Sequence, residues 1–224
     1  MKRFIHIILI VSLVAGSFVL VAMKMSGLKD NVPATKNIKL HETGIVNKHI
    51  VDTAVSLLRS GYVVLRMGMG ADSRLLAQFN RKNKSYSHCG IVMVEDGQPY
   101  VYHSIGGEDN PDARLRRDPA KLFFSPRYNS ALAVIKYDMS DNEVNKLRRV
   151  VSTYYRQRPK FDMKFDLETD DKLYCAEFVY KALNRATGDS TYIRPTSAAG
   201  IRFVGIDDLF VNQHAGIVWQ TAFK

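Results

Sequence analysis

The sequence predicts an α+β domain in which helices pack against an antiparallel sheet. Three observations lead to this prediction. Apolar residues recur at helical spacing in some segments, and they alternate or run continuously in others. The dipeptide Asp96-Gly97 joins two neighbouring strand-like segments as a hairpin. The composition, with 46% hydrophobic and 24% charged residues, is ordinary for a globular protein.

Each element of this domain has its own signal. Apolar residues at helical spacing predict a helix over 45–58, which ends before Gly61. Ser140 and Glu143 form the capping box of a second helix, 140–155. The remaining predictions are a helix over 172–186, a short helix over 71–79, a loop over 106–119, a helical turn over 119–124, and strands over 62–68, 87–95, 98–105, 131–137 and 216–223.

The N-terminal segment predicts export. Two basic residues precede a mostly apolar run, 4–23, which has about the length needed to span a bilayer. We therefore expect a signal peptide or an N-terminal membrane anchor over 1–27, a polar linker over 28–44 and one globular domain over 45–224. That domain would lie in the periplasm or another extracytoplasmic space, and cleavage of the segment stays open.

The chain is strongly basic, with a net charge of +10 and a pI of about 9.6. Such a charge favours anionic partners. For an exported domain these would be lipid headgroups or wall polymers, and not nucleic acid. The basic segments "RLLAQFNRKNKS", "RLRR" and "KLRRVVSTYYRQRPK" are first interpreted as solvated faces, which could also hold the domain against an anionic membrane or wall.

The predicted hairpin brings two histidines to one face of the sheet. If Asp96-Gly97 is a two-residue turn, Gly90 lies opposite His103. Side chains two residues apart share a face, so His88 and His103 lie on the same side, diagonally ~7–8 Å apart at the backbone. Gly90 leaves room between them for the two rings. A hydrogen-bonded core or surface histidine is the alternative interpretation of each.

The two cysteines are interpreted differently. Cys89 points away from His88 and is expected to be a core thiol. Cys175 lies in the first turn of the predicted helix 172–186, where unpaired N–H groups stabilise a thiolate. It also belongs to the apolar face of that helix, so a small buried hydrophobe is the alternative. A disulfide is not expected, because a catalytic Cys175 would lie on the histidine side.

A thiol, an imidazole that takes its proton and a polar group that orients the imidazole form an activated nucleophile. The candidates here are Cys175, His88 and His103. The motifs "SHCGIVMV", "YVYHSIGG" and "FDMKFDLETDDKLYCAEFVYKAL" resemble the YiiX/YebB-like branch of the NlpC-type, papain-like cysteine hydrolases. This resemblance, from about residue 61 to 209, implies a circularly permuted papain-like fold with an antiparallel sheet packed against a Cys-bearing helix. It implies Cys175 as the nucleophile, His88 as the base and His103 as the ring-orienting residue.

Four hypotheses about function follow. The first is hydrolysis of peptide or isopeptide amide bonds, such as those of cell-wall peptides, through an acyl-enzyme. The second uses the same three residues on lipid esters or acyl groups. The third is a zinc site of His88, His103 and Cys175, although the short-range ligand pairs usual for zinc are missing. The fourth is a non-catalytic binding module of the envelope. We expect neither a cofactor nor a metal, and a peptide or acyl substrate as the partner.

Overall fold

The structure is a computed structural model that describes residues 36–106, 114–198 and 200–223, with side chains described from residue 44. The predicted signal peptide or anchor, 1–27, lies outside these residues. Among the described residues, no helix has the length and hydrophobicity needed to cross a bilayer. The chain divides into two units, Met1–Glu42 and Thr43–Lys224, and the fold described below is that of the second.

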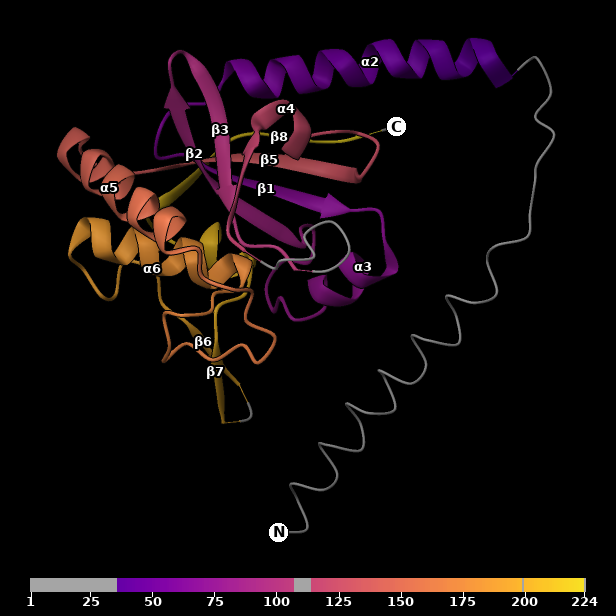
Figure 1. Cartoon of the computed structure of the whole chain (residues 1–224). Coiled ribbons are helices and arrows are strands. Elements are labelled where there is room, and N and C mark those ends of the chain that lie inside the picture. Colours follow the sequence, from indigo (N-terminus) through magenta and orange to yellow (C-terminus); the bar gives the residue numbers. More distant parts are fainter. Residues whose placement is uncertain (1–35, 107–113, 199, 224) are drawn as a thin grey trace, which may run out of the picture. The chain divides into compact units, whose positions relative to one another are not determined.

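A six-stranded antiparallel sheet forms the centre of this unit, in the order β4-β3-β2-β1-β5-β8 (Figure 1). The inner strands are apolar over most of their length because both of their faces are covered. The α+β class is thereby confirmed. The strands are β1 Val63–Gly68, β2 His88–Glu95, β3 Gln98–His103, β4 Arg116–Pro119, β5 Asn129–Tyr137 and β8 Ala215–Ala222.

Helices cover both faces of the sheet (Figure 1). One face carries Cys89, Ile91 and Met93 of β2 and packs against α5 and α6. The other face carries Val92 and Val101 and packs against α4 and the C-terminal part of α2. The helices are α2 Lys36–Ser56, α3 Ala71–Ala77, α4 Ala120–Phe123, α5 Asp141–Gln157 and α6 Cys175–Thr187, and the small elements are β6 Thr196–Ala198, β7 Ile201–Phe203 and the 3-10 helix η1 Asp207–Leu209.

The predicted hairpin register is confirmed. Glu95 pairs with Gln98 across the turn, and the same register continues along β2 and β3. Asp96 and Gly97 both have positive φ, of 48° and 75°, as a two-residue turn that matches the strand twist requires. The capping box of α5 is also present, with Ser140 and Glu143 bonded reciprocally.

Three of the differences from the sequence predictions are a strand that was not predicted and the starts of two helices. The segment 116–119 is strand β4 instead of loop; it is charged and ends in Pro119, as edge strands often do, and so it lacks an alternating apolar signal. Helix α2 begins at Lys36, within the predicted linker. Helix α6 begins at Cys175, because Tyr174 is its extended N-cap residue.

Gly90 provides the space that the two histidines need. A Cβ atom at this position would lie 2.8 Å from the Tyr102 carbonyl oxygen and 3.0 Å from the His103 Cβ atom, and it would overlap Val101. We predict that Gly90→Ala lowers the free energy of unfolding by about 1–3 kcal/mol, the usual cost of overpacking. Urea denaturation would measure this loss.

Gly44→Ala is the matched control, because nothing lies within 4 Å of a Cβ atom there and the residue is helical. Alanine should leave stability unchanged or raise it by up to ~1 kcal/mol. Equal stability of the Gly90→Ala protein and the wild type would show that the β2–β3 approach is not tight.

Candidate active site

Two histidines from neighbouring strands are joined by a hydrogen bond. His88 is the first residue of β2 and His103 is the last residue of β3. His88 Nε2 lies 2.9 Å from His103 Nδ1, and their rings meet edge to face. Both side chains are buried, with 8% and 1% of the residue surface exposed. The two histidines that the sequence predicts on one face therefore do lie together.

An aspartate extends this pair into a chain of three groups. Asp118, in β4, places Oδ2 3.0 Å from His103 Nε2. Arg116 holds the same carboxylate, with Nη2 2.8 Å from Oδ2. The sequence analysis missed Asp118 because it assigned this segment to a loop. An acidic residue two positions after an arginine in "RLRRDP" was the available signal, but only the pairing of β4 with β3 shows what it contacts.

These hydrogen bonds assign one proton to each imidazole ring, at a defined nitrogen. A carboxylate only accepts hydrogen bonds, so His103 donates from Nε2–H to Asp118. In a neutral ring this leaves His103 Nδ1 as the acceptor, and His88 Nε2–H donates to it. The lone pair of His88 then lies on Nδ1. A neutral imidazole with a free lone pair is the form that a general base requires.

Burial keeps both imidazoles neutral. It lowers the pKa of His88 well below its ordinary value, and the positive charges of Arg66 and Arg116 act in the same direction. Burial also lowers the pKa of His103, although the hydrogen bond to Asp118 opposes this. The Phe123 ring lies against both histidines, with centroids 5.7 Å and 5.2 Å away, and excludes water from them.

Asp118 itself stays ionised. Burial acts to raise the pKa of this carboxyl, but hydrogen bonds from His103 and Arg116 hold it below its usual value. The site is thus a buried row of three hydrogen-bonded side chains. The negatively charged Asp118 lies at one end, and the neutral imidazole of His88 lies at the other. Burial and the charges of Arg66 and Arg116 keep a proton off His88 at rest, and the Asp118 carboxylate is the group that can stabilise one during the reaction.

Cys175 is the first residue of α6, as the sequence predicts for a thiol at a helix start. Hydrogen bonding from the Cys89 thiol, and from the backbone N–H groups of Ala176, Cys89 and Cys175, lowers the pKa of Cys175 against the effect of burial. Burial raises the pKa of Cys89 well above its ordinary value, so Cys89 remains a thiol. The polarised sulfur is therefore that of Cys175.

The position of Cys175 corrects one sequence expectation. Cys175 packs on the face of the sheet that also holds Cys89, and not on the face of Val92 and Val101. The two cysteines are neighbours with free thiols. Within the described part of the chain, no hydrogen bond joins Cys175 to His88 or His103. The structure therefore brings the histidines together with Asp118, and it brings Cys175 together with Cys89.

Neighbouring groups fix the start of α6. The Tyr174 backbone N–H donates to Glu177 Oε2 at 3.1 Å, and burial raises the pKa of Glu177 to about 7. Lys181 lies 2.9 Å from the same carboxylate. The Tyr174 hydroxyl accepts a bond from the Val204 N–H at 2.7 Å, so this ring is a packed aromatic that ties α6 to the segment after β7.

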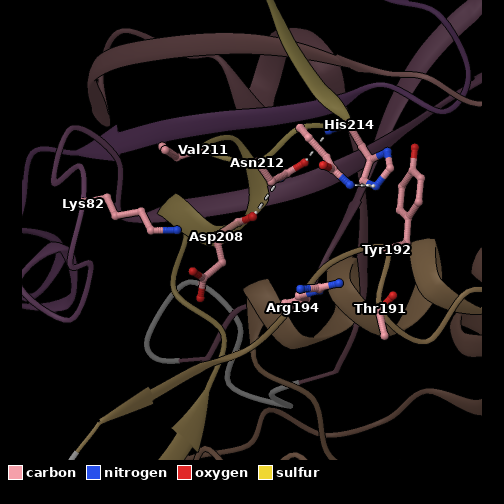
Figure 2. A pocket seen from close by; sticks show the side chains of 9 residues that line it. Lys82, Thr191, Tyr192, Arg194, Asp208, Val211, Asn212 and His214 are labelled. Atoms are coloured by element: carbon pink, nitrogen blue, oxygen red, sulfur yellow. Dashed lines mark hydrogen bonds between the residues drawn. The ribbon is translucent and has the colours of Figure 1, made fainter.

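A surface cavity of about 290 Å³ lies elsewhere on this unit (Figure 2). Its walls combine the cations Lys82 and Arg194 with the carboxylate of Asp208, so they favour no single ligand charge. The Tyr192 ring stacks on His214 at one end, with centroids 4.2 Å apart. The cavity contains none of the predicted catalytic residues.

Comparisons with known proteins relate the chain to the protein YiiX. No protein-family model matches the sequence. The chain is 21% identical, over 132 residues, to the uncharacterized protein YiiX of Escherichia coli strain K12. The aligned part covers 58% of this chain and 59% of that protein, so the chain spans less than two thirds of the relative's length.

A solved structure gives the same relative. The crystal structure of the metalloprotein YiiX from Escherichia coli O157:H7, DUF1105, superposes with a TM-score of 0.58 and 17% identity. The superposition covers 73% of this chain and 98% of the YiiX chain. The chain shares the fold of YiiX. At this identity the likeness establishes the fold and leaves the chemistry to the residues of the site.

The buried histidines predict a dependence of stability on pH. In the folded protein the pKa values of both histidines lie below the ordinary value of about 6.5. At a pH below 6.5 the unfolded chain therefore binds protons that the folded protein does not. We predict that the free energy of unfolding falls between pH 7 and pH 5, by up to about 1.4 kcal/mol per pH unit for each histidine. Urea titrations at several pH values measure this slope.

His88→Gln should remove one histidine's share of the slope. His49→Gln, which changes an exposed histidine of α2, should leave the slope as in the wild type. Identical slopes for His88→Gln and the wild type would contradict the burial of a neutral His88.

Proposed function

We propose that this protein is a cysteine hydrolase that cleaves amide bonds, in peptides or isopeptides such as those of the cell wall, through an acyl-enzyme on Cys175. The observation that carries the proposal is the buried Asp118–His103–His88 chain, with a polarised thiol at the start of a neighbouring helix. The motif resemblance to NlpC-type hydrolases supports it, and the fold shared with YiiX is an α+β fold, the class that this resemblance implies. The permuted papain-like arrangement is part of this proposal.

In the first step His88 Nδ1 takes the proton of the Cys175 thiol, and Sγ attacks the carbonyl carbon of the substrate. In the structure His88 packs with Phe123 on one face of the sheet and Cys175 packs with Cys89 on the other, so the reaction requires a rearrangement at the start of β2 or of α6 that brings these two atoms together. The carbonyl oxygen gains negative charge. The first N–H groups of α6 and the positive end of its dipole are suited to stabilise that charge.

In the second step the protonated His88 gives its proton to the leaving amine, and the C–N bond breaks. A thioester between Cys175 and the acyl group remains. Water then loses a proton to His88 and attacks the thioester, which releases the acid and restores the thiol. His103 and Asp118 do not touch the substrate; they orient His88 and stabilise its protonated form.

Hydrolysis or transfer of lipid acyl groups is the second candidate. It would use the same residues, because an ester carbonyl reacts with a thiolate in the same way. The specific observation that favours it is the exposed apolar surface of Leu76 and Phe79, which reaches Tyr174 beside Cys175 through Phe165. Parallel assays on cell-wall peptides and on acyl lipids, with the Cys175→Ala protein as blank, separate the two substrates.

A metal site does not fit these residues, although the structural relative is described as a metalloprotein. His88 Nε2 and His103 Nδ1 are directed at each other at 2.9 Å, so a zinc ion could not take both nitrogens as they stand. Within the described ranges, no group of three or more His, Cys, Asp or Glu side chains is arranged to hold a metal ion. The proposed reaction uses none.

We place this activity in the cell envelope, because export is predicted for residues 1–27 and the chain carries a net charge of +10. A binding module without activity is the remaining alternative. It would retain the fold and the histidine pair but would show no reaction at Cys175.

A thiol-reactive probe tests the proposal without knowledge of the substrate. We predict that iodoacetamide labels Cys175 at neutral pH faster than a free cysteine, because the pKa of Cys175 is lowered and its side chain is only partly buried. Mass spectrometry of the peptides locates the label. His88→Ala should slow the subsequent turnover of an activated thioester or ester substrate by about 100-fold or more.

Cys89→Ala is the matched control. It removes the other thiol, which is buried, and should leave one label per chain at Cys175, added more slowly because the hydrogen bond from the Cys89 thiol is lost. Labelling that persists in Cys175→Ala, or that never occurs in the wild type, would refute the proposal. Stoichiometric zinc that is lost in Cys175→Ala would instead support the metal hypothesis.

A further inference from the structure

Helix α3 exposes apolar side chains that a soluble surface helix would normally bury. Leu75, Leu76 and Phe79 are 49%, 40% and 58% exposed. They lie one, three or four positions apart and so share one stripe of the helix and the turn that follows it. Ala77 is the buried residue that attaches α3 to the rest of the fold. The stripe therefore faces outward.

A second segment extends this apolar surface. Phe165, in the loop between α5 and α6, stacks on Phe79 with ring centroids 6.0 Å apart. Met163, two residues earlier, is 77% exposed. We call Leu75, Leu76, Phe79, Met163 and Phe165 the α3 patch. Phe79 and Met163 are 84 residues apart in the sequence, yet their two segments contribute to one surface.

Basic residues border the α3 patch. On the α3 side, Arg81, Lys82 and Lys84 follow Asn80 and are exposed, against one exposed carboxylate, Asp72. On the other side, the exposed Lys164 is accompanied by the exposed carboxylates of Asp166 and Glu168, so the positive charge is concentrated in the loop 81–84. In the described part of the chain none of the four forms a salt bridge. The carboxylate of Asp207 is buried beneath this loop, where it accepts the Arg81 backbone N–H at 2.8 Å, so it does not lie at the surface among the four basic side chains.

From this combination we infer that the α3 patch docks on the surface of an anionic lipid bilayer. Exposed Leu and Phe side chains on a short amphipathic segment enter the boundary between headgroups and acyl chains. Each neighbouring Lys or Arg adds electrostatic attraction to an anionic surface. A second copy of the chain is disfavoured as the occupant where the basic loops 81–84 of two copies would face each other.

The α3 patch is connected to the candidate nucleophile. The Phe165 ring contacts the Tyr174 ring with centroids 4.9 Å apart, and Tyr174 is the N-cap residue directly before Cys175. Docking would therefore hold Cys175 near the bilayer. This last step rests on the proposed role of Cys175 as the nucleophile, and it would bring acyl lipids, the second candidate substrate, within reach of the thiol.

Tryptophan fluorescence tests the docking independently of any activity. Phe79→Trp is placed in the full chain together with Trp219→Phe, so that one tryptophan remains. The protein is mixed with phosphatidylglycerol vesicles whose acyl chains are brominated. We expect strong quenching relative to unbrominated vesicles, because bromine quenches only an indole that reaches the acyl region. Pure phosphatidylcholine vesicles should give much weaker quenching.

Ile217→Trp in the same background is the matched control, since Ile217 is 49% exposed on β8. Both variants carry the same N-terminal residues, so attachment through those residues affects them equally. Quenching at position 79 but not at 217 supports the inference. Equal quenching at both, none at 79, or equal quenching with both lipids would overturn it. In the absence of vesicles, burial of the indole at position 79 that increases with protein concentration would also overturn the inference, because it would identify a second copy of the chain as the occupant.

Discussion

The pairing of β2 with β3 is the constraint on which the candidate site depends. Its register places His88 and His103 on one face, and the missing side chain of Gly90 lets the strands approach until the two rings share a hydrogen bond. The same strand β3 pairs with β4, and this second register brings the carboxylate of Asp118 to His103. A shift of one residue in either pairing would turn these side chains to the opposite face.

Electrostatics gives this geometry its direction. The histidines are buried close to Arg66 and Arg116, whose positive charges disfavour a positive charge on either imidazole. Asp118 is the compensating anion, and it is held on the far side of His103. The pKa of Cys175 is lowered by hydrogen bonds from the Cys89 thiol and from backbone N–H groups, and not by an imidazolium. Such a site suits a neutral base that acquires its charge only during the reaction.

Local signals in the sequence were sufficient to predict the hairpin, its register and the pairing of the two histidines. Asp96-Gly97 specifies a turn geometry that few other residue pairs adopt, and the turn then fixes the register that pairs the histidines. The capping box at Ser140 and the helix start at Cys175 are local in the same sense. Asp118 was not predictable in this way, because its role depends on an edge strand without an apolar pattern. The side of the sheet occupied by Cys175 likewise depends on how α6 packs, which no local motif encodes.

The central claim is that Asp118 fixes the protons of both rings so that His88 Nδ1 is free to act as a base. NMR two-bond nitrogen–proton correlations of the imidazoles, in isotope-labelled protein at neutral pH, test it most directly. We predict that His88 and His103 are both neutral and both protonated at Nε2, and that Asp118→Asn disturbs this pattern at His103 in a folded protein. A His88 ring protonated at Nδ1, or charged at neutral pH, would contradict the account.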